Sequence, residues 1–236
     1  MESASSPLEL KNRHVVVTGG TGALGRAVVQ AVVEAGAICT VPSSRDSITP
    51  PWDDHPNIRL VPKVDLCCEE SVVQFYAGLD SLWASIHVAG GFSMSAIADT
   101  SLKTFQDMFR KNAITAFLCC REATVRMRES GDGGRIVNIA ARTVEHPAGG
   151  MVAYTTAKDA VASMTRNLAE ELRSESIEVN AILPSIIDTP ANREAMPDAD
   201  FSCWPTPEEI AQEILQMVSP QNQPMTGHLV GIYGDI

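Results

Sequence analysis

Basic residues are scarce in this 236-residue chain: 18 lysines and arginines stand against 29 aspartates and glutamates, which gives a formal net charge of −11 at pH 7. Binding to a nucleic-acid backbone or to anionic lipid needs clustered lysine and arginine side chains. The charge balance therefore argues against nucleic acid and against a membrane surface as partners, and leaves a small-molecule substrate as the expected one.

Long apolar runs and metal-binding spacings are also missing. No apolar run reaches the length of about 18 residues that a membrane span needs, and the start, MESASSPLELK, lacks the basic-then-apolar order of a secretory signal. The six cysteines contain no C-x-x-C spacing, so we expect reduced thiols and no metal site. These absences predict a soluble, cytoplasmic protein with a flexible N-terminal segment over residues 1–12.

Short apolar runs alternate with helical patterns along the rest of the chain. The runs are HVVVT (14–18), AICTV (37–41), IRLV (58–61), WASIHVA (83–89), RIVNIA (135–140), IEVNAIL (177–183) and HLVGIY (228–233). Near-continuous apolar strands are typical of a parallel sheet covered on both faces. The pattern predicts one α/β domain over residues 13–236, built on a doubly wound parallel sheet.

The segment VVVTGGTGALGRAVV places a glycine-rich turn between the first apolar run and the first helical pattern. Gly19, Gly22 and Gly25 permit a tight turn, a close approach of the backbone to a pyrophosphate, and close packing of the helix on the strand. An ordinary strand-to-helix turn is the alternative interpretation. The strand before the turn and the helix after it are the context that a dinucleotide site requires, and they favour such a site.

Three further stretches are compatible with a bound dinucleotide. VAGG (88–91) ends a strand with small residues, as a chain passing under a nucleotide needs, although a plain glycine turn gives the same pattern. Asp65 is placed either to accept a hydrogen bond from an adenine amino group or to cap a helix. After the second strand, Ser43, Ser44 and Arg45 favour NADP over NAD, because an acidic side chain there would repel the 2′-phosphate.

The stretch AYTTAK places Tyr154 and Lys158 four residues apart, on one face of a helix. A free phenol has a pKa of about 10, and a nearby ammonium favours its phenolate form. We therefore expect Lys158 to lower the pKa of Tyr154 and Tyr154 to give a proton to the substrate. A tyrosine and a lysine with this spacing are usually a surface coincidence when no other motif accompanies them. Downstream of the glycine turn, the same spacing predicts a catalytic pair.

Taken in order, these motifs resemble the short-chain dehydrogenase/reductase family. The likeness rests on the TGGTGALG turn, VAGG, Asn112 in the following helix, Tyr154-x-x-x-Lys158 and NAILPSIIDTP (180–190). It implies a single Rossmann-type domain with a parallel sheet of about seven strands and NADP or NAD as cofactor. It also implies a homodimer or homotetramer that pairs through the helices over 104–128 and 152–175.

The resemblance implies roles for individual residues as well. Asn112 would anchor a water that relays protons to Lys158, whereas a solvent-facing or locally capped asparagine is the alternative. The catalytic set is then Tyr154, Lys158 and Asn112. The implied cofactor-binding set is Gly19, Gly22, Leu24, Gly25, Ser43, Ser44, Arg45, Asp65, Leu66, Ala89, Gly90, Tyr154, Lys158, Pro184, Ile187 and Thr189.

Within the family, the likeness is greatest to dihydropteridine reductase and its uncharacterised bacterial relatives. It is carried by GGTGALG, VAGGF, AARTVEHPAGGMVAY and DTPANREAMPDADFSCW (188–204), the last of which lies in the expected substrate lid, about 185–207. That enzyme has an acidic residue where Ser43 falls and a tryptophan where Phe92 falls. The implied substrate contacts are Phe92, Ala141, Met151, Asn192, Arg193 and Trp204, although the lid residues are equally compatible with packing.

Ala141 stands where most of the family has a serine. A hydroxyl there steadies the oxygen of a substrate carbonyl, and the loss of one such donor costs about 2.7 to 4 kcal/mol. A quinonoid dihydropterin spreads the incoming charge over several heteroatoms and needs a proton donor more than an oxyanion donor. The residue set therefore favours reduction of a small conjugated acceptor, unless Thr143 or Arg142 replaces the missing hydroxyl.

Two other functions are compatible with the same residues. The first is a general carbonyl or alcohol dehydrogenase of the same family. The second is a catalytically quiet protein that binds NAD(P) as a sensor or scaffold. Ala141 motivates the second function, and the intact Tyr154 and Lys158 argue against it.

Overall fold

The computed structural model describes residues 9–46, 52, 55–221 and 225–235. Seven strands form one parallel sheet: β1 (His14–Thr18), β2 (Ile38–Pro42), β3 (Ile58–Val61), β4 (Ala84–His87), β5 (Gly134–Ile139), β6 (Ile177–Pro184) and β7 (Leu229–Ile232). The spatial order is β3-β2-β1-β4-β5-β6-β7, and every neighbouring pair runs parallel. The α/β, doubly wound parallel sheet of seven strands predicted from the sequence is confirmed.

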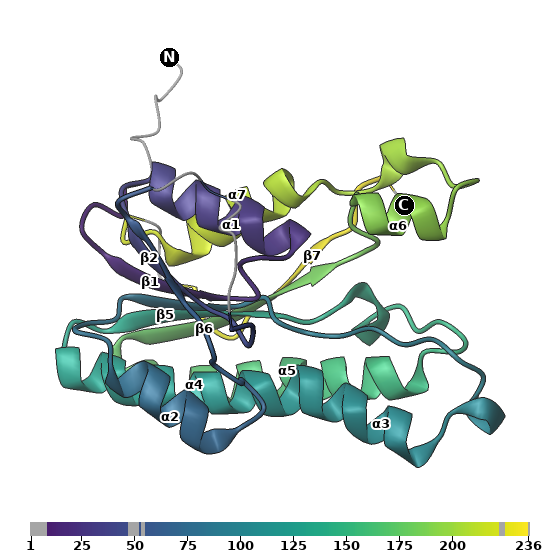
Figure 1. Ribbon diagram of the computed structural model, residues 1–236, viewed down its shortest axis with the longest axis horizontal. Coiled ribbons are helices and arrows are strands. Elements are labelled where there is room, and N and C mark those ends of the chain that lie inside the picture. The colour runs from purple at the N-terminus through teal and green to yellow at the C-terminus, as the bar shows by residue number, and fades with distance from the viewer. Residues whose placement is uncertain (1–8, 47–51, 53–54, 222–224, 236) are drawn as a thin grey trace.

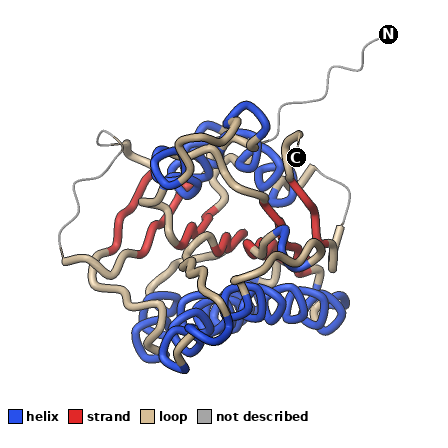
Figure 2. The backbone as a smooth tube through the Cα atoms, turned by 90° about the vertical axis from the view of Figure 1, so that its right-hand side faces the viewer, coloured by secondary structure: helices blue, strands red, loops and turns tan. Residues whose placement is uncertain are grey.

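Helices cover both faces of the sheet (Figures 1 and 2). On one face lie α1 (Ala23–Glu34) and α7 (Pro207–Val218), which pack on each other. On the other face lie α2 (Glu69–Ala77), α4 (Thr115–Ser130) and α5 (Val152–Glu171), and α3 (Leu102–Phe109) extends this layer. Because parallel strands require a crossover of a dozen or more residues, the helices necessarily fall between the strands in sequence.

Each face of the sheet has its own apolar core, because successive side chains of a strand point to opposite faces. Val15 and Val17 of β1 lie in the cluster under α1 and α7, whereas Val16 lies in the cluster under α2 and α4. All three are fully buried. The near-continuous apolar runs seen in the sequence thus reflect a sheet that is buried on both sides.

The chain reverses its direction of winding at β1, since β2 and β4 lie on either side of it. In open α/β sheets the ligand crevice lies outside the carboxyl ends of the strands at such a point. The carboxyl ends of β1, β4 and β5 therefore define where the site is expected. We call the end of the sheet formed by the carboxyl ends of the strands the carboxyl edge, and the end formed by their amino ends the amino edge.

Two segments differ from the sequence prediction. Residues 1–8 of the predicted flexible segment lie outside the described residues, but Leu10 is fully buried and its N–H donates to the Ala35 carbonyl at 2.7 Å. The folded domain therefore begins before residue 13. The expected lid is also less irregular than its proline-rich sequence suggested, because it contains α6 (Pro190–Ala195) and a 3₁₀ turn at Phe201–Cys203.

Candidate active site

The glycine-rich turn after β1 is compact enough that side chains would not fit in it. Gly19 has φ +67, and a Cβ there would lie 2.7 Å from the Ala89 nitrogen. A Cβ on Gly25 would lie 2.1 Å from the Gly19 carbonyl oxygen. Gly19 is thus needed for its backbone conformation and Gly25 for the close approach of α1 to the turn.

The amino end of α1 is arranged to receive an anion. Gly22 is its N-cap and contributes no side-chain cap, and the first turn of this described helix has no acidic residue. Unpaired N–H groups and the helix dipole at such an end favour a phosphate. The turn therefore fits a dinucleotide pyrophosphate, as the motif predicted.

Ser43, Ser44 and Arg45 follow directly on β2, at the carboxyl edge. Ser44 and Arg45 are exposed, while Ser43 is partly buried and accepts the Arg45 N–H through Oγ at 3.3 Å. Asp46 comes next in the chain, and its carboxylate lies 4.0 Å from the Lys63 ammonium. Two hydroxyls and a guanidinium are thus available at the position that distinguishes a ribose 2′-phosphate from a 2′-hydroxyl.

Asp65 has a local structural task. Its Oδ1 accepts the Cys67 N–H at 2.8 Å, and its own N–H donates to Ser71 Oγ at 3.0 Å. This arrangement stabilises the turn that leads into α2, but Asp65 is not the cap of that helix, because its N-cap is Cys68 and has no side-chain cap bond. The second carboxylate oxygen remains on an exposed side chain.

Lys158 lies under the site rather than at its surface. The side chain of this residue of α5 is buried, and Nζ donates to the Ile139 carbonyl at the end of β5 at 2.7 Å. Nζ lies 5.8 Å from the centroid of the Tyr154 ring. Burial lowers the pKa of Lys158 to about 8, so the group is mostly charged at neutral pH.

The prediction that Lys158 lowers the pKa of Tyr154 is wrong for this structure. Burial raises the pKa of the phenol to about 12. Low-dielectric surroundings penalise the phenolate as they penalise the ammonium, and this penalty outweighs the attraction of a cation whose nearest partner is the Ile139 carbonyl. Tyr154 is therefore a neutral phenol at pH 7, a form that can give up a proton but not accept one.

Asn112 holds the loop after β4. It is buried, its Oδ1 accepts the Gly91 N–H at 3.2 Å, and its Nδ2 donates to the carbonyls of Gly91 and Met108, each at 3.0 Å. It lies in a π-helical turn at Arg110–Ile114, a distortion that is frequent at functional sites. The alternative of a solvent-facing asparagine is therefore excluded.

Asn112 and Lys158 meet at Gly90. A Cβ on Gly90 would lie 2.7 Å from Asn112 Oδ1 and 3.5 Å from Lys158 Nζ. Only a residue without a side chain leaves this contact open. The small residues at the end of β4 are thus explained by the approach of two polar groups from α5 and the π-helical turn, a reason that the sequence did not provide.

A buried polar chain anchors the elements that carry these groups. His87 Nδ1 and Asn138 Oδ1 are 2.8 Å apart, and Asn138 Nδ2 donates to Thr165 Oγ1 at 2.9 Å. These residues belong to β4, β5 and α5, and burial lowers the pKa of His87 to about 4. A neutral imidazole thus links the two strands, and Asn138 fixes α5 next to Ile139.

Ala141 lies two residues beyond the end of β5 and is buried, with no side-chain donor to offer. The 3₁₀ turn Arg142–Val144 comes next. The Arg142 guanidinium lies over the Tyr233 ring, 5.4 Å from its centroid, and Val144 packs into the core between the sheet and α5. The Thr143 hydroxyl is covered and has no hydrogen-bond partner among the described residues.

The polar lid residues bind one another. Thr189 caps α6 by accepting the Asn192 N–H at 3.2 Å, and Asn192 Nδ2 donates to the Ile187 carbonyl at 2.8 Å. The Arg193 guanidinium forms two hydrogen bonds to the Asp188 carboxylate, at 2.5 and 2.7 Å. These bonds fix the shape of the lid and leave Arg193 already paired.

The remaining predicted positions differ in their burial and in their contacts. Trp204 is buried with its ring 5.0 Å from that of Phe201, so packing is its visible task. Phe92 is 62% exposed, and its ring meets the Tyr154 ring edge-on at 5.1 Å, while Met151 is the N-cap residue of α5. Leu24 is buried in the cluster under α1 and α7, and Ile187 packs against that cluster. Leu66 packs against the cluster under α2 and α4, and Pro184 ends β6.

No group of three or more histidine, cysteine, aspartate or glutamate side chains in the described ranges could hold a metal ion. Nor does any helix in that part of the chain have the length and apolar character needed to cross a membrane.

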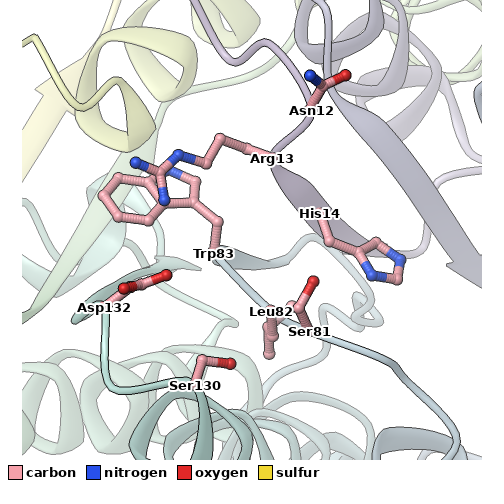
Figure 3. Close-up of a pocket in the computed structure, with 8 residues that line it drawn as sticks. All are labelled: Asn12, Arg13, His14, Ser81, Leu82, Trp83, Ser130 and Asp132. Carbon is pink, nitrogen blue, oxygen red and sulfur yellow. The ribbon is translucent and has the colours of Figure 1, made fainter.

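At the amino edge the structure contains a small hollow lined by Asn12, Arg13, His14, Ser81, Leu82, Trp83, Ser130 and Asp132 (Figure 3). Its volume is about 130 Å³, below the range of about 300 to 1,000 Å³ usual for ligand pockets. The Arg13 guanidinium lies over the Trp83 ring, 4.1 Å from its centroid. This hollow is far smaller than a dinucleotide requires.

Known proteins resemble this chain over most of its length. Residues 13–200 match the family model described as short chain dehydrogenase. A short-chain type dehydrogenase/reductase of Picea abies is 30% identical over 206 residues, 76% of this chain and 72% of that protein. A chloroplastic NADPH-dependent aldehyde reductase-like protein of Arabidopsis thaliana is 28% identical, over 78% of this chain and 75% of that protein.

The solved structure of ElxO with NADP bound has the same fold, with a TM-score of 0.86 and 22% sequence identity. The superposition covers 94% of this chain and 98% of ElxO. The family match includes the glycine turn, Asn112 and the Tyr154–Lys158 pair that the geometry assembles at one edge of the sheet. This chain belongs to the short-chain dehydrogenase family, whose members are NAD(P)-dependent oxidoreductases.

Proposed function

We propose that the protein reduces a small conjugated acceptor, such as a quinonoid dihydropterin, with NADPH favoured over NADH. One observation carries this proposal: the site has a neutral phenol beside a buried ammonium, but Ala141 offers no hydroxyl to a substrate oxygen. The set suits an acceptor that needs a proton and does not concentrate charge on a single carbonyl oxygen.

Tyr154, Lys158 and Asn112 each have a separate role in this reaction. When bound, the reduced nicotinamide supplies a hydride and is thereby oxidised. Tyr154 donates its phenolic proton to the acceptor, which gains one hydride and one proton in total. Lys158 stabilises the phenolate that remains until a solvent proton replaces the one lost, and Asn112 holds the Gly91 loop against the reacting groups.

Preference for NADPH is supported by the strand end after β2. Ser43, Ser44 and Arg45 offer two hydroxyls and a guanidinium, and a guanidinium binds a phosphate better than it binds a hydroxyl. The Arabidopsis relative carries NADPH in its name, and ElxO was solved with NADP. Fluorescence titration with NADPH and NADH measures the preference, and tighter binding of NADH would contradict it.

Steady-state oxidation of NADPH against a quinonoid dihydropterin, a quinone and an aldehyde tests the reaction class. We expect the highest kcat/KM on one of the two conjugated acceptors. The matched variant is Ala141→Ser, which restores a hydroxyl. It should raise aldehyde reduction by up to about a hundredfold and change the conjugated acceptors little. Highest turnover of the wild type on the aldehyde would displace the proposal.

Carbonyl reduction is the second candidate, and the Thr143 hydroxyl is the observation that favours it. A covered hydroxyl without a partner costs free energy, and a bond to a substrate oxygen after rotation about Cα–Cβ would recover that cost. Thr143→Val would then abolish aldehyde reduction and spare the conjugated acceptors. Binding of the cofactor with no turnover of any acceptor, in the wild type and in Tyr154→Phe alike, would instead indicate a sensor or scaffold.

We also propose that the protein acts as a homodimer or homotetramer. Helix α4 exposes apolar side chains: Phe117 is 50% exposed and Val125 is 42% exposed. Apolar groups on a helix face are stabilised when a second copy covers them. Light scattering after size-exclusion chromatography measures the mass, and a monomer at micromolar concentration would contradict this proposal.

A further inference from the structure

Three exposed apolar side chains lie in the two chain segments next to the phenol that we assign as the proton donor. Phe92 is 62% exposed, Met94 is 61% exposed and Val152 is 46% exposed. Phe92 and Met94 lie in the loop after β4, and Val152 is the first residue of α5. We call these three residues the apolar rim.

One member of the apolar rim, Phe92, is in direct contact with Tyr154. The Phe92 ring meets the Tyr154 ring at a centroid distance of 5.1 Å and an interplanar angle of 72°. Edge-to-face contacts of this kind favour a defined ring position. Phe92 therefore connects the rim to the catalytic phenol.

Backbone contacts hold the two segments of the rim together. The Ser95 N–H donates to the Gly150 carbonyl at 2.8 Å. Gly150 has φ +77, and a Cβ there would lie 3.4 Å from Met94 Cγ. The loop after β4 thus packs on the loop that enters α5, so backbone contacts fix the two segments that carry the rim.

The rim is also free of charge. The sequence contains no charged residue over 88–98 or over 147–157, although 20% of the chain is charged. Two lysines approach this loop: the buried Lys158 Nζ would lie 3.5 Å from a Cβ on Gly90, and the Lys111 Cδ would lie 2.9 Å from a Cβ on Gly91. A substrate group placed against Phe92, Met94 and Val152 therefore meets side chains that carry no charge.

We propose that the apolar rim binds a hydrophobic ring or alkyl group attached to the reacting ring of the substrate. The substrate class is then a conjugated acceptor with an apolar body, and acceptors with polyhydroxylated or charged substituents are poor substrates. The reacting ring rests on the proposed function, whereas the apolar body rests on the rim. Phe92 is the principal specificity-determining residue, because its ring is exposed to solvent and also contacts Tyr154.

A second copy of the chain is a poorer occupant of this surface. A protein surface seated on Phe92 would cover the side from which a substrate approaches Tyr154, since the two rings touch. An apolar substrate group buries the same side chains only while it is bound. The rim thus stays open in a working enzyme.

The test compares acceptor pairs that share a reacting ring and differ in the attached group. One pair is quinonoid 6,7-dimethyldihydropterin and quinonoid dihydrobiopterin, and the other is 2-methyl-1,4-naphthoquinone and 2,3-dimethyl-1,4-benzoquinone. Wild type, Phe92→Ala, Phe92→Leu and Leu102→Ala are assayed with each. Leu102 is the matched control, because it is 71% exposed and lies at the start of α3.

We expect Phe92→Ala to raise KM for the more apolar member of each pair about tenfold, a change that corresponds to about 1.4 kcal/mol. KM for the more polar member should change about twofold or less. Dividing the KM change of one member by that of the other cancels the intrinsic reactivity of the acceptors. Phe92→Leu should restore most of the preference, and Leu102→Ala should behave as the wild type. Equal changes for both members of each pair would overturn the proposal.

A binding measurement separates failure of this inference from failure of the proposed function. Calorimetric titration of 2-naphthol and of phenol into the NADP⁺-bound protein requires no turnover. If no acceptor is reduced but 2-naphthol binds about tenfold more weakly to Phe92→Ala than to wild type, the proposed function fails and the rim stands. If acceptors are reduced but 2-naphthol binds both proteins equally, the rim proposal fails alone. A lower molecular mass of Phe92→Ala, with unchanged KM, would instead assign the rim to a subunit contact.

Discussion

The two edges of the sheet are built from different materials. At the carboxyl edge, glycines and main-chain groups dominate: Gly19 and Gly25 close the turn after β1, and the Ile139 carbonyl holds Lys158. At the amino edge, large side chains dominate. The Trp83 indole has the Arg13 guanidinium 4.1 Å and the Arg135 guanidinium 4.9 Å from its centroid, and its Nε1 donates to the Val218 carbonyl at 2.8 Å.

This difference between the edges indicates that buried polar groups serve catalysis at the carboxyl edge and stability at the amino edge. At the carboxyl edge, burial shifts the pKa values of Tyr154 and Lys158, and neither group forms an ion pair with the other. At the amino edge, Arg135 is paired with Glu178 at 3.1 Å. We therefore expect variants of the first edge to change rates and variants of the second to change the free energy of unfolding.

The largest expected effect is at the carboxyl edge. Tyr154→Phe removes the proton donor and keeps the ring, so kcat/KM should fall by about 10²- to 10⁴-fold, measured as NADPH oxidation with the preferred acceptor. Thermal unfolding should change little. Tyr233→Phe is the matched control, because the pKa of Tyr233 is also raised to about 12 but its hydroxyl donates to Glu145. Similar losses in both variants would remove the distinction of Tyr154.

The next largest effect is at the amino edge. Trp83→Ala empties a buried site, and the free energy of unfolding should fall by about 3 kcal/mol, measured by urea denaturation. Arg13→Ala removes one of the two guanidinium groups from the ring and should cost less, about 0.5 to 1 kcal/mol. Assayed well below their melting temperatures, both variants should keep kcat within about twofold of wild type. A large loss of kcat in either would break the comparison between the edges.

A smaller effect connects function with stability at the carboxyl edge. Lys158 has a pKa of about 8 in the folded protein, below its ordinary value of 10.5, so its charge destabilises the fold at pH values below 8. Lys158→Met should therefore lose activity yet unfold with a free energy about 2 kcal/mol higher at pH 7. This gain should shrink towards pH 10, where the lysine is neutral in the fold and increasingly neutral in the unfolded chain. A destabilised variant at pH 7 would contradict the burial cost.

The sequence predicted the fold well because its signals are local. Apolar runs bounded by glycine and proline gave all seven strands, and the four-residue spacing placed Tyr154 and Lys158 on one helical face. Glycine spacing likewise predicted the turn after β1, since Gly19 has the left-handed conformation that glycine favours and a Cβ on Gly25 would clash with the Gly19 carbonyl oxygen. In each case a few neighbouring residues carry the information.

Features that depend on tertiary contacts were missed or reversed. The Ile139 carbonyl that binds Lys158 has no sequence signature, because every residue has a carbonyl. The direction of the Tyr154 pKa shift follows from burial, which spacing does not reveal. The pairing of Arg193 with Asp188, five residues away in a segment that reads as a loop, was likewise not predicted. The polar chain through His87 and Asn138 joins strands 51 residues apart.

The pH profile of a single turnover tests the central claim most directly. NADPH-loaded protein is mixed with the preferred acceptor, and the rate of cofactor oxidation is followed from pH 6 to 10. With a phenol of pKa about 12 and an ammonium of pKa about 8, the donor stays protonated throughout, and the rate should be level near pH 6 to 7 and fall as Lys158 loses its proton above pH 8. A rate that rises through this range would show that the reaction requires the phenolate, and would contradict the assignment of Tyr154 as a neutral proton donor.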